Sequence, residues 1–205
     1  MGGFLAGLGN VVKALNAIGA ASTATPAPVR PTGAVPSKVV GGGKVADQPI
    51  VGPSTISLNV FRQALIHYNS PAVVDMENTH ISTDLADELY DVAIAWGVNP
   101  AVALAFFVHE SGAGTQGYAR QTKNWGNLRS GPAELKNDGA FAVYSSWLVA
   151  LDDFCRLLVG PLYVKGGLTT VSQVTPRYAP SADANDPAAY AAAVNAQVAV
   201  WEAMG

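Results

Sequence analysis

The spacing of apolar residues along the chain predicts a series of helices after residue 60. Apolar positions recur there at intervals of three and four, which is typical of a helix with one packed face. The predicted helices cover residues 60–68, 85–96, 101–108, 147–158, 168–175 and 187–201. Residues 124–146 lack this period, and Asn137-Asp138-Gly139 between short extended runs favours a β-hairpin. The pattern therefore predicts a mainly α (α+β) domain with a small β-hairpin lobe.

One predicted helix differs from the others because it is apolar on every side. It begins at Asn99-Pro100, a capping residue followed by proline at the first helical position. Its body, residues 101–108, reads Ala-Val-Ala-Leu-Ala-Phe-Phe-Val. A helix without a polar face is expected in the centre of a core.

The first 58 residues have a different pattern. Residues 1–20 carry a narrow apolar stripe at helical spacing, formed by Phe4, Leu8, Val11, Leu15 and Ile18. It predicts an amphipathic helix that anchors or docks the chain, with a cleaved signal peptide or disorder as the alternatives. Residues 21–58 are rich in Pro, Gly and Ala and poor in large apolar side chains, as in a flexible linker. Residues 59–205 are then the compact domain.

Composition excludes several classes of function. Only 13% of the residues are charged and the net charge is −3, so there is no basic footprint for nucleic acid. No apolar run approaches the roughly 20 residues of a membrane span. The single cysteine excludes an internal disulfide framework and a cysteine-based zinc site. His67 and His80 have no carboxylate at ligand spacing, so we expect neither a metal nor a cofactor.

Glu110 is the most informative residue of the sequence. It ends the most hydrophobic helix, although carboxylates are rarely fully buried. Burial would raise the pKa of this carboxyl, as a general acid at neutral pH requires. The Ser-Gly-Ala-Gly run at 111–114 predicts an open floor beside it. The alternative is a glutamate that turns into solvent at a helix end.

The sequence around Glu110 resembles a known family. His109-Glu110-Ser111-Gly112-Ala113-Gly114-Thr115 is similar to the Glu-Ser-x-x-Gly-Thr signature of bacterial and phage peptidoglycan N-acetylglucosaminidases, which belong to the lysozyme-like superfamily. Further similar segments are residues 97–100, 123–129, 141–146 and 177–190. The resemblance covers about residues 70–205 and implies a lysozyme-like helical domain.

The resemblance also implies a reaction. It predicts cleavage of peptidoglycan glycan strands after N-acetylglucosamine, with Glu110 as general acid and Tyr178 in a supporting role. Most glycosidases use a second carboxylate, for which Asp138 and Glu134 in the predicted hairpin are candidates. The substrate's own N-acetyl group is the alternative nucleophile in this superfamily.

Sugar binding needs flat aromatic surfaces together with amide or hydroxyl groups. Residues of these types in the similar segments are Tyr118, Asn124, Trp125, Asn127 and Tyr144. Loop packing is an equal interpretation for Trp125 and Asn127, and a place in the core is the alternative for Tyr144.

Other functions remain open at this point. A lytic transglycosylase would use a similar single glutamate, but its usual Gly-Leu-Met-Gln and Ala-Tyr-Asn-Ala-Gly segments are absent from the sequence. A non-catalytic, particle-associated wall-binding module is a further alternative. The substrate places the expected activity at the cell wall outside the cytoplasm, reached by secretion or as part of a phage tail or injection particle. In the second case residues 1–20 would dock on a protein partner.

Overall fold

The computed structural model describes residues 45–73, 83–129, 137–138 and 141–204, and these are mostly helical. The predicted amphipathic helix 1–20 and most of the predicted linker lie outside the described residues. The helices are α2 (Leu58–His67), α3 (Thr83–Trp96), α4 (Pro100–Ser111), α5 (Ala119–Thr122), α6 (Trp147–Val159), α7 (Val171–Tyr178) and α8 (Pro187–Glu202), with short 3-10 turns η1 (Val164–Gly166) and η2 (Ser181–Asp183). The mainly helical fold is therefore confirmed, and each predicted helix after residue 60 has a counterpart.

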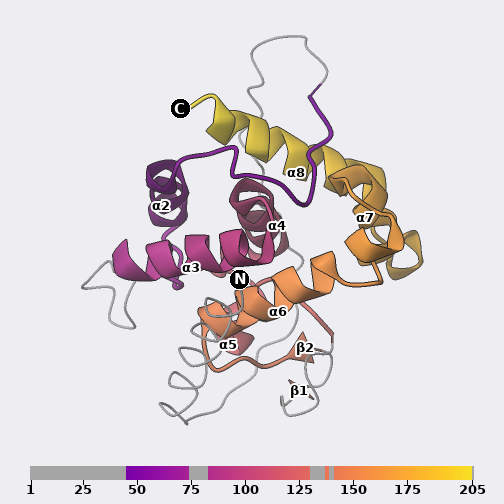
Figure 1. The fold of residues 1–205 in the computed structure, drawn as a ribbon. Helices are drawn as coiled ribbons and strands as arrows, with labels where there is room; N and C mark the ends of the chain where they lie inside the picture. The colour runs from indigo at the N-terminus through magenta and orange to yellow at the C-terminus, as the bar shows by residue number, and fades with distance from the viewer. Residues whose placement is uncertain (1–44, 74–82, 130–136, 139–140, 205) are drawn as a thin grey trace.

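Helix α4 occupies the centre of the fold. It packs against α2, α3 and α8, which surround it in Figure 1. All its residues from Pro100 to Phe107 are buried, as its uniform apolarity predicts. The side chain of Asn99 accepts a hydrogen bond from the Ala101 amide and caps the helix. His109 and Glu110 lie in the last turn of this central helix.

The two strands are short. β1 (Asn137–Asp138) and β2 (Phe141–Ala142) pair antiparallel, with Asp138 opposite Phe141. The Ala142 amide donates to the Leu128 carbonyl at 2.9 Å, which ties β2 to the segment after α5. Phe141 is thereby placed near the segment that follows α5.

Residues 45–57, at the end of the predicted linker, pack on the domain, so this part of the predicted boundary is wrong. Ile50 is completely buried, and its amide donates to Thr169 while its carbonyl accepts from the Asn99 amide. Ile56 is buried as well. The segment, indigo in Figure 1, leads into α2. Two well-placed isoleucines and a few backbone hydrogen bonds hold a stretch that its composition alone suggests is flexible.

In the part of the chain that the structure describes, no helix has the length and apolarity required to cross a bilayer.

Candidate active site

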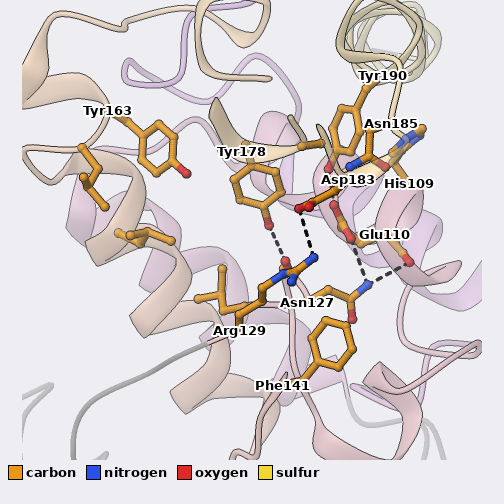
Figure 2. A pocket seen from close by; sticks show the side chains of 15 residues that line it. His109, Glu110, Asn127, Arg129, Phe141, Tyr163, Tyr178, Asp183, Asn185 and Tyr190 are labelled. Carbon is orange, nitrogen blue, oxygen red and sulfur yellow. Dashed lines mark hydrogen bonds and ion pairs between the residues drawn. The ribbon is translucent and has the colours of Figure 1, made fainter. Parts of the chain in front are cut away.

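A pocket of about 540 Å³ opens at the C-terminal end of α4. Its walls come from segments far apart in the sequence: the end of α4, the loop after α5, β2, the end of α6, and α7, η2 and α8 (Figure 2). The lining residues are His109, Glu110, Gly126, Asn127, Leu128, Arg129, Phe141, Leu157, Leu162, Tyr163, Tyr178, Ala179, Asp183, Asn185 and Tyr190.

Both carboxyl oxygens of Glu110 have a hydrogen-bond donor. The Tyr190 hydroxyl donates to Oε1 at 2.5 Å, and Asn127 Nδ2 donates to Oε2 at 2.9 Å. The same Nδ2 also donates to the Glu110 backbone carbonyl at 3.1 Å, which fixes the orientation of the amide. Burial raises the pKa of Glu110, and the hydrogen bonds from Tyr190 and Asn127 oppose only part of that effect. The site therefore favours a Glu110 carboxyl that keeps its proton to a higher pH than an exposed glutamate does.

The Ser-Gly-Ala-Gly run after Glu110 is a tightly packed turn. Gly112 adopts a left-handed conformation and closes α4. A Cβ on Gly114, which also has a positive φ, would lie 2.6 Å from the Trp147 ring. Ala113 is completely buried, and none of these residues lines the pocket. The predicted open floor is therefore wrong, because Gly114 lets the backbone pack on the rings of Trp147 and Phe107.

The loop after α5 carries Asn127 to Glu110. Trp125 stacks on Phe107 with ring centroids 3.9 Å apart, and its Nε1 donates to the Ala103 carbonyl at 2.9 Å. Asn124 closes the loop, since its Nδ2 donates to the Leu128 and Ala142 carbonyls and its Oδ1 accepts from the Leu128 amide. Trp125 and Asn124 are both completely buried. They form the framework of the loop, which does not fit their predicted contact with sugar.

Gly126 separates this framework from Asn127. A Cβ at Gly126 would lie 2.5 Å from both the Phe154 ring and the Tyr178 hydroxyl. Asn127 itself has a φ of 49°, in the left-handed region that asparagine tolerates. The close approach allowed by glycine lets the loop reach both Tyr178 and Glu110.

Tyr144 and Tyr118 do not line the pocket. Tyr144 is buried, and its hydroxyl donates to Oδ2 of Asp153 at 2.6 Å. Burial, followed by the hydrogen bond and the negative charge of Asp153, raises the Tyr144 pKa. The core interpretation therefore fits Tyr144, whereas sugar binding does not. Half-buried Tyr118 contacts Phe141, with ring centroids 5.2 Å apart, and so supports a lining residue.

Tyr178, which the family resemblance predicts in a supporting role, lines the pocket at the C-terminal end of α7. Its hydroxyl donates to the Gly126 carbonyl. Burial, and then the charge of Glu110, raises the Tyr178 pKa well above its usual value. Tyr178 is therefore present as a neutral phenol.

Tyr190 lies in the predicted helix 187–201, and its contact with Glu110 is not among the predictions from the sequence. Tyr178 and Tyr190 both pack on Phe106, with ring centroids 5.2 and 5.6 Å from it. His109 packs against Tyr190 with 4.0 Å between the ring centroids, and burial lowers the pKa of the His109 imidazole. A tyrosine at helical spacing with Val194 and Val198 reads as a core residue, so the pattern held no signal for its hydroxyl.

Two further lining residues, Arg129 and Asp183, form an ion pair with 3.0 Å between Nη2 and Oδ2. Neither was a candidate in the sequence analysis. Of the proposed second carboxylates, Asp138 lies in β1, where its backbone pairs with Phe141, and Glu134 lies outside the described residues. The described residues contain no group of His, Cys, Asp and Glu that could hold a metal ion.

A comparison with protein families matches the part of the chain that contains this pocket. Residues 86–203 match the model of the Glucosaminidase family, described as mannosyl-glycoprotein endo-beta-N-acetylglucosaminidase. The matched region contains α4, α6, α7 and every residue that lines the pocket. A comparison with curated protein sequences gives no match.

Proposed function

Because the chain belongs to the glucosaminidase family, and is therefore a glycoside hydrolase with peptidoglycan as its expected substrate, we propose that it cleaves glycan strands at the bond after N-acetylglucosamine. Glu110 is the general acid of this reaction. The observation that carries the proposal is the Glu110 carboxyl at the pocket, which accepts hydrogen bonds from two donors and whose pKa is raised by burial.

The two donors give the oxygens of Glu110 different roles. A tyrosine hydroxyl can accept as well as donate, whereas an amide Nδ2 only donates. The acid proton therefore belongs on Oε1, where Tyr190 can reverse its hydrogen bond, while Oε2 continues to accept from Asn127. After the proton passes to the glycosidic oxygen, both groups donate to the carboxylate and stabilise it.

Tyr178 supports the reaction as a neutral hydroxyl. Its raised pKa argues against a phenolate nucleophile, and its proton is directed at the Gly126 carbonyl. Its hydroxyl oxygen retains the capacity to accept a hydrogen bond from a substrate acetamide N–H. This arrangement is compatible with a substrate-assisted mechanism, in which the acetamido group takes the place of an enzyme nucleophile.

A second carboxylate remains an alternative to that mechanism. Asp183 is a described acid of the pocket, but it is paired with Arg129. Asp138 is next to the pocket through the backbone pairing with Phe141. An inverting enzyme needs its two carboxyls roughly 6.5–9.5 Å apart, and a retaining one about 5–5.5 Å. The anomeric form of the first product, followed by NMR, separates inversion from the two retaining mechanisms.

Product analysis tests the proposed function. Purified peptidoglycan is digested with the wild-type protein and with Glu110→Gln, and the fragments are identified by mass spectrometry. We expect fragments with reducing N-acetylglucosamine ends, and a loss of rate of about 10²–10⁴-fold in the variant, the typical contribution of a general acid. Anhydro products would instead identify a lytic transglycosylase. Binding to the wall without cleavage would identify a non-catalytic module, and an unchanged rate in Glu110→Gln would refute the role of Glu110.

The route to the wall is a separate proposal. A glycan-cleaving domain of this family acts outside the cytoplasm, and the apolar stripe of residues 1–20 supports docking on a virion, tail or injection-device protein. Deletion of residues 1–20 should then release the domain from the particle while wall hydrolysis is retained. Equal retention on the particle, or secretion of the free protein, would refute docking.

A further inference from the structure

Arg129 and Asp183 meet at the pocket from distant parts of the chain. Arg129 follows the loop that carries Asn127, and Asp183 ends η2 between α7 and α8. Their ion pair is drawn in Figure 2 with Tyr178 and Glu110 on either side of it, and all four residues line the same pocket.

This ion pair is poorly suited to a structural role. The side chain of Arg129 is 71% exposed and that of Asp183 is 43% exposed. Ion pairs this open to water contribute little to stability, because water and salt screen them. The guanidinium has five N–H donors, and the contact joins only one nitrogen, Nη2, to one oxygen, Oδ2. Arg129 can therefore exchange Asp183 for another anion at low cost.

The surroundings make the arginine exceptional. Among the described residues that line the pocket, Arg129 is the single Lys or Arg, whereas Glu110 and Asp183 are both acids. The sequence after residue 58 also has more acidic than basic residues. An isolated guanidinium fork in acidic surroundings matches the geometry of a carboxylate, which it can bind through two parallel hydrogen bonds.

We propose that Arg129 binds a carboxylate that the muramoyl residue of the substrate carries, and that Asp183 holds the guanidinium at the pocket until the substrate replaces it. This inference rests on the proposed function, because it requires peptidoglycan as the ligand. The carboxylate has two sources: the stem peptide, or the lactyl group where the stem is absent. Arg129 then selects muramoyl-containing strands over neutral polymers of N-acetylglucosamine.

The test compares substrates that differ only in this charge. Stem-bearing glycan fragments and fragments without stems are each prepared with free carboxylates and with carboxylates converted to amides. For the wild-type protein, amidation should raise KM about three- to tenfold, the range for an exposed charge-assisted contact, with kcat nearly unchanged. The fragment type in which amidation has this effect identifies the source of the carboxylate.

The variants assign the effect to Arg129. Arg129→Gln should raise KM for the free-carboxylate fragment to that of the amidated one and abolish the difference between them. Arg129→Lys should retain part of this KM difference, because lysine keeps the positive charge but lacks the planar guanidinium that can form two parallel hydrogen bonds. Asp183→Asn should keep the full difference with an equal or lower KM, since the competing carboxylate is gone. Exposed Arg120, which does not line the pocket, gives the control Arg120→Gln with wild-type behaviour.

Two results would overturn the inference. Equal wild-type KM values for free and amidated fragments exclude carboxylate binding, and a full difference in folded Arg129→Gln excludes Arg129 as the binding group. If Asp183→Asn also loses the KM difference between free and amidated fragments, the ion pair serves to hold two walls of the pocket together. A wild-type protein that cleaves none of the fragments refutes the proposed function itself.

Discussion

The Tyr190 hydroxyl donates a hydrogen bond to Oε1 of Glu110 at 2.5 Å, across 80 positions of the sequence. Helix α8 thus supplies the donor to the acid at the end of α4, and the two helices pack against each other. Because the hydrogen bond stabilises the ionised form, it limits how far burial raises the Glu110 pKa.

Tyr190→Phe removes this donor and should raise the Glu110 pKa further. A general acid with a higher pKa stays protonated to higher pH. The alkaline limb of the plot of kcat/KM against pH should therefore shift to higher pH. The maximal rate should fall about tenfold, because the carboxylate left after proton transfer loses a hydrogen bond to a charged group. Tyr68→Phe, whose hydroxyl bonds Gln197 away from the pocket, is the matched control. An unshifted limb in Tyr190→Phe would contradict this role.

Glu110→Gln should change the pH dependence of stability. The folded-state pKa of Glu110 is raised, so its stabilising contribution is complete below the unfolded-state pKa, roughly 4.3, and is lost as pH rises through the folded value. The variant lacks this loss. Its Tm relative to wild type should therefore increase from pH 4 to pH 8 in thermal unfolding followed by circular dichroism. Exposed Glu88 provides Glu88→Gln as a control for charge removal. A Tm difference that does not vary with pH would show that ionisation of Glu110 costs nothing.

Gly126→Ala should disrupt the site by displacing the loop that carries Asn127. The added Cβ would lie 2.5 Å from the Tyr178 hydroxyl and the Phe154 ring, so the loop that carries Asn127 must shift. We expect the free energy of unfolding to fall by about 1–3 kcal/mol. We also expect Gly126→Ala to lose more activity than a comparison variant that is destabilised to the same extent. Cys155→Ala is the comparison, because Cys155 is buried next to Phe154 on α6 but does not line the pocket that contains Glu110. Equal activity in two equally destabilised variants would mean that the position of the loop does not matter.

Tyr144→Phe should affect stability and leave catalysis unchanged. It removes a donor from the Asp153 side chain, which is 4% exposed and, among the described residues, keeps its contact with Arg156. Loss of one partner from a buried charged group costs about 1–3 kcal/mol, measurable by urea unfolding. The KM for glycan fragments should equal that of the wild type. An increased KM would return Tyr144 to the sugar-binding residues.

The helices could be predicted from the sequence, and so could the position of Glu110 at the end of the most apolar one. The apolar run of α4 and the carboxylate near its end are local features, so periodicity predicts the burial of Glu110, while its role as general acid stays a prediction from the family resemblance. Trp125 could not be assigned in this way, because stacking on Phe107 and binding a sugar require the same flat aromatic ring.

The contacts between residues of the pocket could not be predicted for a different reason. Tyr190 and Glu110, like Arg129 and Asp183, meet only when distant segments pack, and no periodic pattern reports which side chains converge. The segment around Ile50 was assigned to the linker because Pro, Gly and small residues dominate its composition. Its attachment depends on backbone hydrogen bonds, which composition does not encode.

That attachment also defines where mechanical load enters the domain. The segment bonds the start of α4 through Asn99, the residues before α7 through Thr169, and α8 through the contact of Gln48 with Asn195. The same three helices carry Glu110, Tyr178 and Tyr190. Tension transmitted along the chain from its N-terminal side would therefore pull on the three helices that form the pocket.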